Sequence, residues 1–235
     1  MKKNIFVVFT LILVTFFTLR VRAAEDSVYS FKWLDQDKEV YVLQNRTFRK
    51  DGRLYLNVGG GFATSNPFVK SFNLQGRVSY FFTEEFGFEF LYSKNDGKEN
   101  DAASSVRDNG VTGSIPFRRI VNNYMAAMVV WSPFYAKINT FNTIVYLDWM
   151  FGLGAAKLEE HNNRNELNDP TDKTETTKTH SGLVWETSLM FYFTPQWSMR
   201  VDLTGIHYRA AMVHDENKDT WYTNYDATVS VGFNF

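Results

Sequence analysis

The stretch WYTNYDATVSVGFNF, residues 221–235, alternates between apolar and polar side chains almost without a break. Apolar residues such as Tyr225, Val229, Val231, Phe233 and Phe235 take the odd positions, and small or polar residues take the even ones. Successive side chains of a β-strand point to opposite faces. The pattern therefore predicts a strand with one apolar face and one polar face.

The same alternation recurs along the chain, with turn-forming residues between the segments. It predicts eight strands, at residues 53–64, 71–82, 86–94, 123–131, 143–156, 182–193, 197–208 and 221–235. The segment 123–131 is the weakest of these predictions because it is apolar on both faces. Strands joined in sequence by short turns are antiparallel neighbours.

Two kinds of barrel fit this pattern. No apolar run after residue 24 reaches the roughly 18 residues that a transmembrane helix needs. A chain without such helices crosses a membrane only as a closed barrel, in which every backbone group is paired. Alternation alone fits that barrel, with its apolar face outward, and equally a soluble barrel with an apolar ligand cavity.

Four features favour the transmembrane barrel. The lysines, among them Lys94, Lys137 and Lys157, fall in predicted turns, loops or strand ends, and the polar face is rich in small residues. Tight links at 83–85 and 194–197 and a longer one at 132–142 alternate with still longer ones, as in outer-membrane proteins, and aromatic residues gather at strand ends. We therefore expect an all-β fold, an eight-stranded antiparallel up-and-down transmembrane β-barrel at residues 53–235, in the cell outer membrane.

The beginning of the chain indicates export. Lys2 and Lys3 precede an apolar stretch at residues 5–19, and Ala23 offers a cleavage site, so residues 1–23 are predicted to be a secretory signal peptide. A transmembrane anchor is the alternative, but Arg20 and Arg22 interrupt the apolar stretch too early for a full span.

Composition excludes several functions. The 235 residues are 44% hydrophobic and contain no cysteine, so the chain has enough material for a core and no means for disulfides, thiolate catalysis or cysteine metal sites. The net charge of −1 disfavours a nucleic-acid partner. We expect no cofactor, no metal site and no catalytic residues.

Charged residues of both signs lie on the predicted polar faces. They are Arg77, Glu89, Asp148, Glu186, Arg200, Asp202 and Asp226. An arginine facing lipid near the middle of the membrane costs about 2 to 4 kcal/mol, so these residues are expected to face the lumen. The sequence predicts an ion-pair network that fills the narrow interior, and the alternative is a gated narrow pore in which the pairs rearrange.

Both ends of the mature chain resemble known outer-membrane proteins. The C-terminal strand with Tyr225, Val229, Val231, Phe233 and Phe235 resembles the signal that the bacterial barrel-assembly machinery receives. The segment DKEVYVLQNR, residues 37–46, resembles the segment that precedes the barrel in a family of small bacterial outer-membrane β-barrel domain proteins, and the architecture is similar to the OmpA, OmpX and OmpW barrels. The resemblance implies a barrel in contact with outer-membrane lipid and lipopolysaccharide.

Residues 24–52 precede the first predicted strand, and an even strand number places them in the periplasm beside the C-terminus. A short strand or a strap across the barrel mouth is one interpretation of residues 39–44. Arg46, Arg49 and Lys50 could contact peptidoglycan or a protein partner, but interfacial anchoring or a solvated linker is the favoured interpretation.

The predicted role is structural or one of surface interaction through the extracellular loops, with a narrow pore as the alternative. The loops are polar, and a divalent cation held by Glu159, Glu160, Asp169 and Asp172 could bridge them to lipopolysaccharide, although no calcium-loop spacing is present. A lipid-modifying enzyme is the less favoured alternative, because His207 has only Gly205 and Arg209 beside it on its own face and neither is a nucleophile.

Overall fold

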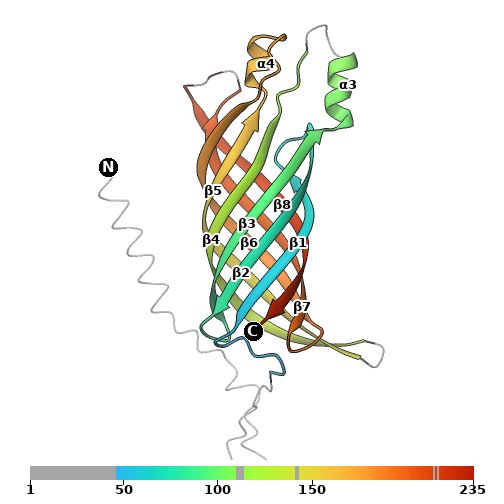
Figure 1. Cartoon of the computed structure of the whole chain (residues 1–235), viewed down its shortest axis with the longest axis vertical. Helices are drawn as coiled ribbons and strands as arrows, with labels where there is room; N and C mark the ends of the chain where they lie inside the picture. The colour runs from blue at the N-terminus through green and yellow to red at the C-terminus, as the bar shows by residue number, and fades with distance from the viewer. Residues whose placement is uncertain (1–45, 110–113, 141–142, 214, 216) are drawn as a thin grey trace, which may run out of the picture. The chain divides into compact units, whose positions relative to one another are not determined.

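The computed structural model describes residues 46–235, apart from 110–113, 141–142, 214 and 216, as a closed barrel. Each strand pairs with the next in antiparallel fashion, and the first pairs with the last. The strands are β1 Leu54–Thr64, β2 Val69–Phe81, β3 Phe86–Glu99, β4 Arg119–Thr140, β5 Thr143–Asn162, β6 Thr176–Tyr192, β7 Trp197–Ala211 and β8 Asp219–Asn234. The predicted eight-stranded antiparallel up-and-down barrel is confirmed (Figure 1).

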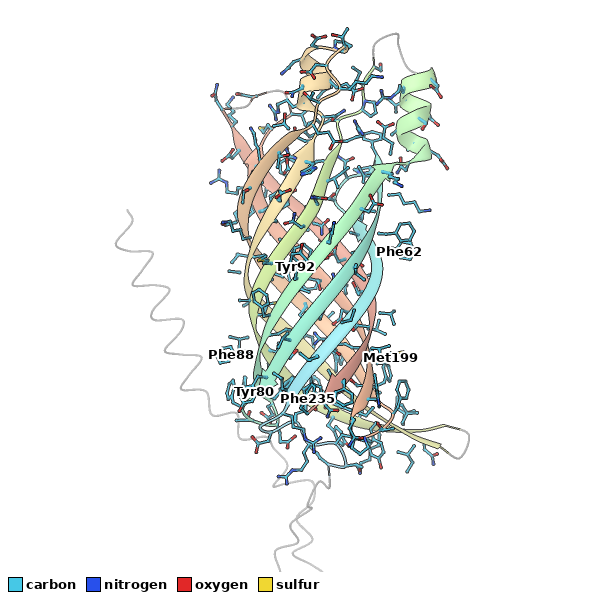
Figure 2. The ribbon with its side chains drawn as sticks, in the orientation of Figure 1. Phe62, Tyr80, Phe88, Tyr92, Met199 and Phe235 are labelled. Carbon is cyan, nitrogen blue, oxygen red and sulfur yellow. The ribbon has the colours of Figure 1, made fainter. Side chains whose placement is uncertain are left out.

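The barrel has an apolar outer wall and a polar interior. Phe62, Leu74 and Leu153 leave 59%, 63% and 67% of their surface exposed on the outside, whereas the alternate positions bear buried Asn, Ser, Gln and Arg. Phe62 and Phe88 project from the wall in Figure 2. This arrangement is the reverse of that of a water-soluble protein, so it removes the alternative of a soluble barrel with an apolar cavity.

The two ends of the barrel differ. Tight links at 82–85 and 193–196 lie at one end, here named the turn end, where β8 also finishes. At the opposite loop end, longer links contain the helices α3 (Asp101–Asn109) and α4 (Arg164–Asn168) (Figure 1). Neither of these helices, within the described residues, is long and apolar enough to cross a membrane.

The strands extend beyond the predicted boundaries, mostly at the loop end. β3, β5 and β6 therefore include Lys94, Lys157 and Lys178 on the strands themselves, and the expectation that lysines avoid strands is wrong. Apolar alternation reports only the lipid-facing part of a strand, whereas hydrogen bonding continues into the aqueous region, where lysine is tolerated.

The link expected at 132–142 is also mostly strand. β4 and β5 stay paired from Phe134 and Trp149 to Thr140 and Thr143, past the last pair between β5 and β6 at Tyr146. A register shift between Trp131 and Phe134 follows Trp131, the last residue of β4 that pairs with β3. The sequence did not reveal it, because the protruding part has no lipid-facing alternation.

Two apolar clusters inside the barrel explain why 123–131 is apolar on both faces. One cluster includes Tyr124 and Met128, and the other, nearer the turn end, includes Val130, Met150 and Met190. Inward residues of β4 supply both clusters, while its outward residues face the exterior.

Candidate functional site

Five charged side chains meet across the middle of the lumen and form a cluster, here named the lumen cluster. Arg77 comes from β2, Glu89 from β3, Glu186 from β6, and Arg200 and Asp202 from β7. All five are almost completely buried. Strand alternation aims each of them inward, and closure of the sheet brings β2 and β3 opposite β6 and β7.

The two arginines of the lumen cluster share the three carboxylates. Arg200 donates to Glu89 and Asp202 at 2.5 Å each and to Glu186 at 2.7 Å. Arg77 donates to Glu89 at 2.6 Å and to Glu186. Charge-assisted bonds of this kind connect opposite walls of the barrel, and they satisfy charges that would be costly to bury alone.

Asp226 lies apart from the lumen cluster, one layer nearer the loop end. Its carboxylate accepts from the Tyr124 hydroxyl at 2.6 Å, the Asn224 amide at 2.7 Å and the Gln75 amide at 3.1 Å. Gln75 also accepts from Arg77 at 3.0 Å, so the two layers are joined by hydrogen bonds rather than by an ion pair to Asp226.

Asp148 lies apart at the turn end, and its partner is Lys50. The Lys50 ammonium is 2.7 Å from the Asp148 carboxylate and donates to the Ser132 hydroxyl at 2.6 Å, and Tyr192 donates to Asp148 at 2.5 Å. Lys50 has 0% of its surface exposed. The interpretation of Lys50 as part of a solvated linker is therefore wrong, because the chain before β1 turns into the barrel mouth.

The segment 46–52, here named the mouth segment, has further contacts at the turn end. Phe48 stacks on Tyr192 with ring centroids 4.9 Å apart. Arg46 is 3.5 Å from the Glu84 carboxylate, which also accepts from the Lys50 backbone N–H at 3.0 Å. Partial burial raises the pKa of Glu84, but these N–H donors and the nearby cations lower it more, so the net pKa is below its usual range. The predicted signal peptide at residues 1–23 lies outside the described residues, and so does the part of the predicted periplasmic segment 24–52 up to residue 45.

A second buried ion pair outside the lumen cluster lies near the loop end. Arg119 is 3.1 Å from Glu160, lies 3.7 Å over the Tyr222 ring and donates to the Ala211 carbonyl at 2.8 Å. Glu160 is buried in this contact. The expectation that Glu160 helps to bridge a cation to lipopolysaccharide is therefore wrong, because its carboxylate points inward to an arginine.

An ion-pair network connects the two longest loops. Glu166 of α4 accepts from Arg107 of α3 at 2.9 Å and from Arg118 at 3.3 Å. Glu99 accepts from Arg107 at 2.6 Å, and its carboxylate lies 3.1 Å from the Arg118 guanidinium. The pairing of these residues and the contacts of the mouth segment with the barrel were missed from the sequence, although Arg46, Arg49 and Lys50 were singled out there. No local pattern marks them, since their partners come from distant loops.

The described residues contain no group of three or more potential metal-ligating side chains.

His207 lies on the outer wall between two hydrogen-bonding partners. Its Nε2 is 2.9 Å from the Trp185 indole nitrogen, and its Nδ1 is 2.8 Å from the Thr223 hydroxyl. The expectation that no hydroxyl lies near it is wrong, because Thr223 is its partner across the strand pair. An indole N–H only donates, so Nε2 must accept and the proton must sit on Nδ1. In this arrangement His207 donates to Thr223 and cannot take its proton.

The C-terminal residues singled out in the sequence share the outer wall. Tyr225, Val229, Val231 and Phe235 are exposed, and Phe233 is half-buried. The backbone of Phe235 donates to the Leu54 carbonyl at 3.0 Å, so the end of the chain is bound to the first strand. The apolar side chains of this final strand therefore lie on the lipid-facing surface of the seam between β1 and β8.

A closed eight-stranded barrel with an apolar outer wall and a charged, filled interior defines a small transmembrane barrel of the bacterial outer membrane. The family model described as outer membrane protein beta-barrel domain matches residues 42–235. The chain belongs to this family, and its location is the outer membrane. No curated protein matches the chain in sequence.

Several solved structures are similar in fold. The N-terminal β-barrel domain of OprF from Pseudomonas aeruginosa is 14% identical, with a TM-score of 0.46 over 79% of this chain and 98% of that one. Neisserial surface protein A is 11% identical, with a TM-score of 0.47 over 78% and 96%. The attachment invasion locus protein Ail of Yersinia pestis is 13% identical, with a TM-score of 0.40 over 79% and 99%.

Proposed function

We propose that this outer-membrane barrel has a structural and surface-interaction role and that its lumen does not conduct ions. The observation that carries the proposal is the lumen cluster, in which two arginines and three carboxylates cross the interior with almost no exposed surface. Contacts of Lys50 with Asp148 and of Arg119 with Glu160 support closure at two further levels.

Planar-bilayer recording tests this proposal. The wild-type barrel is expected to be silent, because an eight-stranded barrel has a narrow interior and the buried lumen cluster crosses it. Arg200→Ala leaves three carboxylates with one arginine, so we expect cation-selective steps from this variant if it folds. Arg209→Ala, which removes an exposed outer-wall arginine, is the matched control. Steady steps from the wild-type protein would contradict the sealed lumen.

The interaction surface that we propose is the loop end. The ion pairs of Glu166 and Glu99 with Arg107 and Arg118 support a defined surface made from α3 and α4. Because short turns face the periplasm in outer-membrane barrels, this end is assigned to the cell exterior. Its partner is proposed to be an extracellular protein or a cell-surface molecule. Loss of cell-surface binding after grafting a flexible linker in place of residues 101–109 would support this role.

A narrow pore is the second candidate function, and one observation favours it. Asn57, Ser188 and Ser198 have buried polar side-chain atoms without a hydrogen-bond partner among the described residues. Ordered water is the usual partner of such atoms. Conduction through a hydrated lumen would need rearrangement of the lumen cluster and of the contacts of Lys50 with Asp148 and of Arg119 with Glu160. The same bilayer recording distinguishes the two functions.

Assignments for the two ends of the chain follow from the outer-membrane location. We propose that residues 1–23 are removed on export, that residues 24–52 are periplasmic, and that the strand ending at Phe235 is received by the barrel-assembly machinery. The His207 geometry supports a role without catalysis, since His207 donates to Thr223 instead of accepting from it. Turnover of lipid A by the purified protein that is lost in His207→Ala would contradict this.

A further inference from the structure

A hollow runs along the outer wall of the barrel over β4. The register places Phe90, Ala127, Ala155 and Leu183 side by side on four neighbouring strands. A depression of about 340 Å³ lies over the two alanines, with Phe90 and Met125 on one side and Lys157, Ser181 and Gly182 at the loop-end side. A second depression of about 450 Å³ shares Phe90 and Ala127 and continues toward the turn end. We name the two together the β4 groove.

The walls of the β4 groove are apolar along most of its length. Phe90 and Met125 flank the part nearer the loop end, and Tyr80, Phe88 and Leu153 flank the other part. The whole groove lies on the lipid-facing wall. Its shape, long and apolar with small residues at the floor, fits an alkyl chain rather than a polar ligand.

Two cationic side chains lie near the loop-end side of the groove. Lys157 lies one row above Ala155, and Lys94 lies one row higher on β3, next to Asn123. Both lysines are exposed, and neither ammonium group has an ion-pair partner in the described part of the chain. The nearby acid Glu159 is engaged with His161 at 3.0 Å and Asn122 at 3.3 Å. Lysines at this height extend toward the lipid headgroups.

We propose that the β4 groove holds one acyl chain of lipid A and that Lys157 and Lys94 contact a phosphate of the same molecule. Lys157 lies at the loop-end side of the groove, and the leaflet at that side of an outer membrane contains lipopolysaccharide. An apolar trough that ends at two unpaired cations complements a molecule in which acyl chains and phosphates are covalently joined. The binding site is independent of the lumen, so it does not depend on whether the barrel conducts.

Native mass spectrometry tests the proposal on the full mature chain in phosphatidylethanolamine nanodiscs that contain lipid A. The wild-type barrel is expected to retain one lipid A after transfer to detergent. Ala127→Leu and Ala155→Leu fill the groove and should abolish retention. Lys157→Ala should reduce retention about fivefold, which corresponds to about 1 kcal/mol for one interfacial lysine.

The chain offers matched controls. Ala227→Leu makes the same substitution on the opposite wall, where Ala227 lies between Leu203 and Phe62. Lys173→Ala removes an exposed loop lysine. Both control variants should retain lipid A like the wild type. Gel mobility identifies the variants that fold. If one groove variant does not fold, the other groove variant and Lys157→Ala still test the proposal.

Three results would overturn the proposal. Folded wild-type protein without retained lipid A would exclude the site, and equal loss in Ala227→Leu would exclude the groove as its position. Equal retention of phosphatidylglycerol in place of lipid A would show a general phosphate-lipid contact instead. Stronger retention of lipid A than of its dephosphorylated form would support the assigned role of the lysines.

Discussion

The local sequence predicts that the Lys50 side chain is exposed to solvent, since Arg49 and Lys50 together resemble a solvated basic linker. In the structure these neighbours differ completely. The Lys50 ammonium lies 2.7 Å from Asp148 inside the mouth, whereas the Arg49 side chain is 73% exposed. The difference depends on the path of the chain over the turn end. That path is a tertiary feature, and no pattern within residues 46–52 records it.

Removal of the Lys50 charge should therefore destabilise the barrel. Lys50→Met leaves the buried Asp148 carboxylate without its cation, and loss of one partner of a buried pair typically costs about 3 to 5 kcal/mol. Urea unfolding in detergent micelles measures the change in free energy. Arg49→Met is the control and should change little, and a double variant with Asp148→Asn should recover part of the loss. Equal stability of Lys50→Met and wild type would contradict the buried pair.

The Glu84 carboxylate predicts a pH dependence. Its pKa is lowered in the folded protein from the usual 4.5, so its stabilising contribution is fully present above that value and is lost as the pH falls through the lowered pKa. Wild type should thus exceed Glu84→Gln in unfolding free energy by a constant amount from pH 7 to about 5, and the difference should shrink in stronger acid. A difference that grows on acidification would contradict this assignment.

At the level of the strands, lipid-facing alternation allowed all eight to be predicted, but not where they end. The strand predicted at 86–94 continues as β3 to Glu99, and the link predicted at 132–142 is mostly the protruding β4–β5 hairpin. Burial against lipid imposes a two-residue period only inside the membrane. Beyond it, hydrogen bonding maintains the strands, and hydrogen bonds between backbone atoms leave no trace in side-chain identity.

The seam between β1 and β8 depends on close backbone approach. A Cβ atom at Gly61, which faces inward, would lie 1.9 Å from the Ala227 carbonyl oxygen, whereas one at Gly76 on the outer wall would meet nothing within 4 Å.

Gly61→Val should therefore lower the unfolding free energy by about 1 to 3 kcal/mol or prevent folding, because the backbone of β8 must shift. The matched variant Gly76→Val should remain near wild type. The fraction of folded barrel by gel mobility and urea unfolding measure both. Similar behaviour of the two variants would contradict the tight seam.

For the whole molecule, part of the charge network could be predicted. Strand phase alone placed all seven charged residues inside, yet only five of them meet in the lumen cluster, while Asp148 and Asp226 bind other partners at different heights. The alternation along a strand specifies whether a side chain faces the lumen or the lipid. The position of the side chain along the barrel axis depends on strand tilt and register. The pairing of the loops through Glu166 had no signal of this kind.

Loosening of the loop end should leave the barrel intact. Glu166→Ala removes the carboxylate through which α4 binds Arg107 and Arg118, and we expect trypsin to cleave residues 101–118 at least several times faster, since local opening becomes easier. The unfolding free energy of the barrel should stay within about 0.5 kcal/mol of wild type. Asp172→Ala, which changes a half-buried turn residue outside the network, is the control. Unchanged cleavage in Glu166→Ala would contradict a network that holds the loops.

The pairing of the first strand with the last makes the wall a ring, and a ring in lipid cannot be shortened by a single strand. Loss of β8 would leave the backbone groups of β1 that face it, between residues 55 and 64, without partners in a medium that offers none. Growth or shrinkage of such a wall must proceed by whole hairpins. Insertions and deletions of any other length are therefore confined to the loops and to the β4–β5 hairpin, where water can satisfy the backbone.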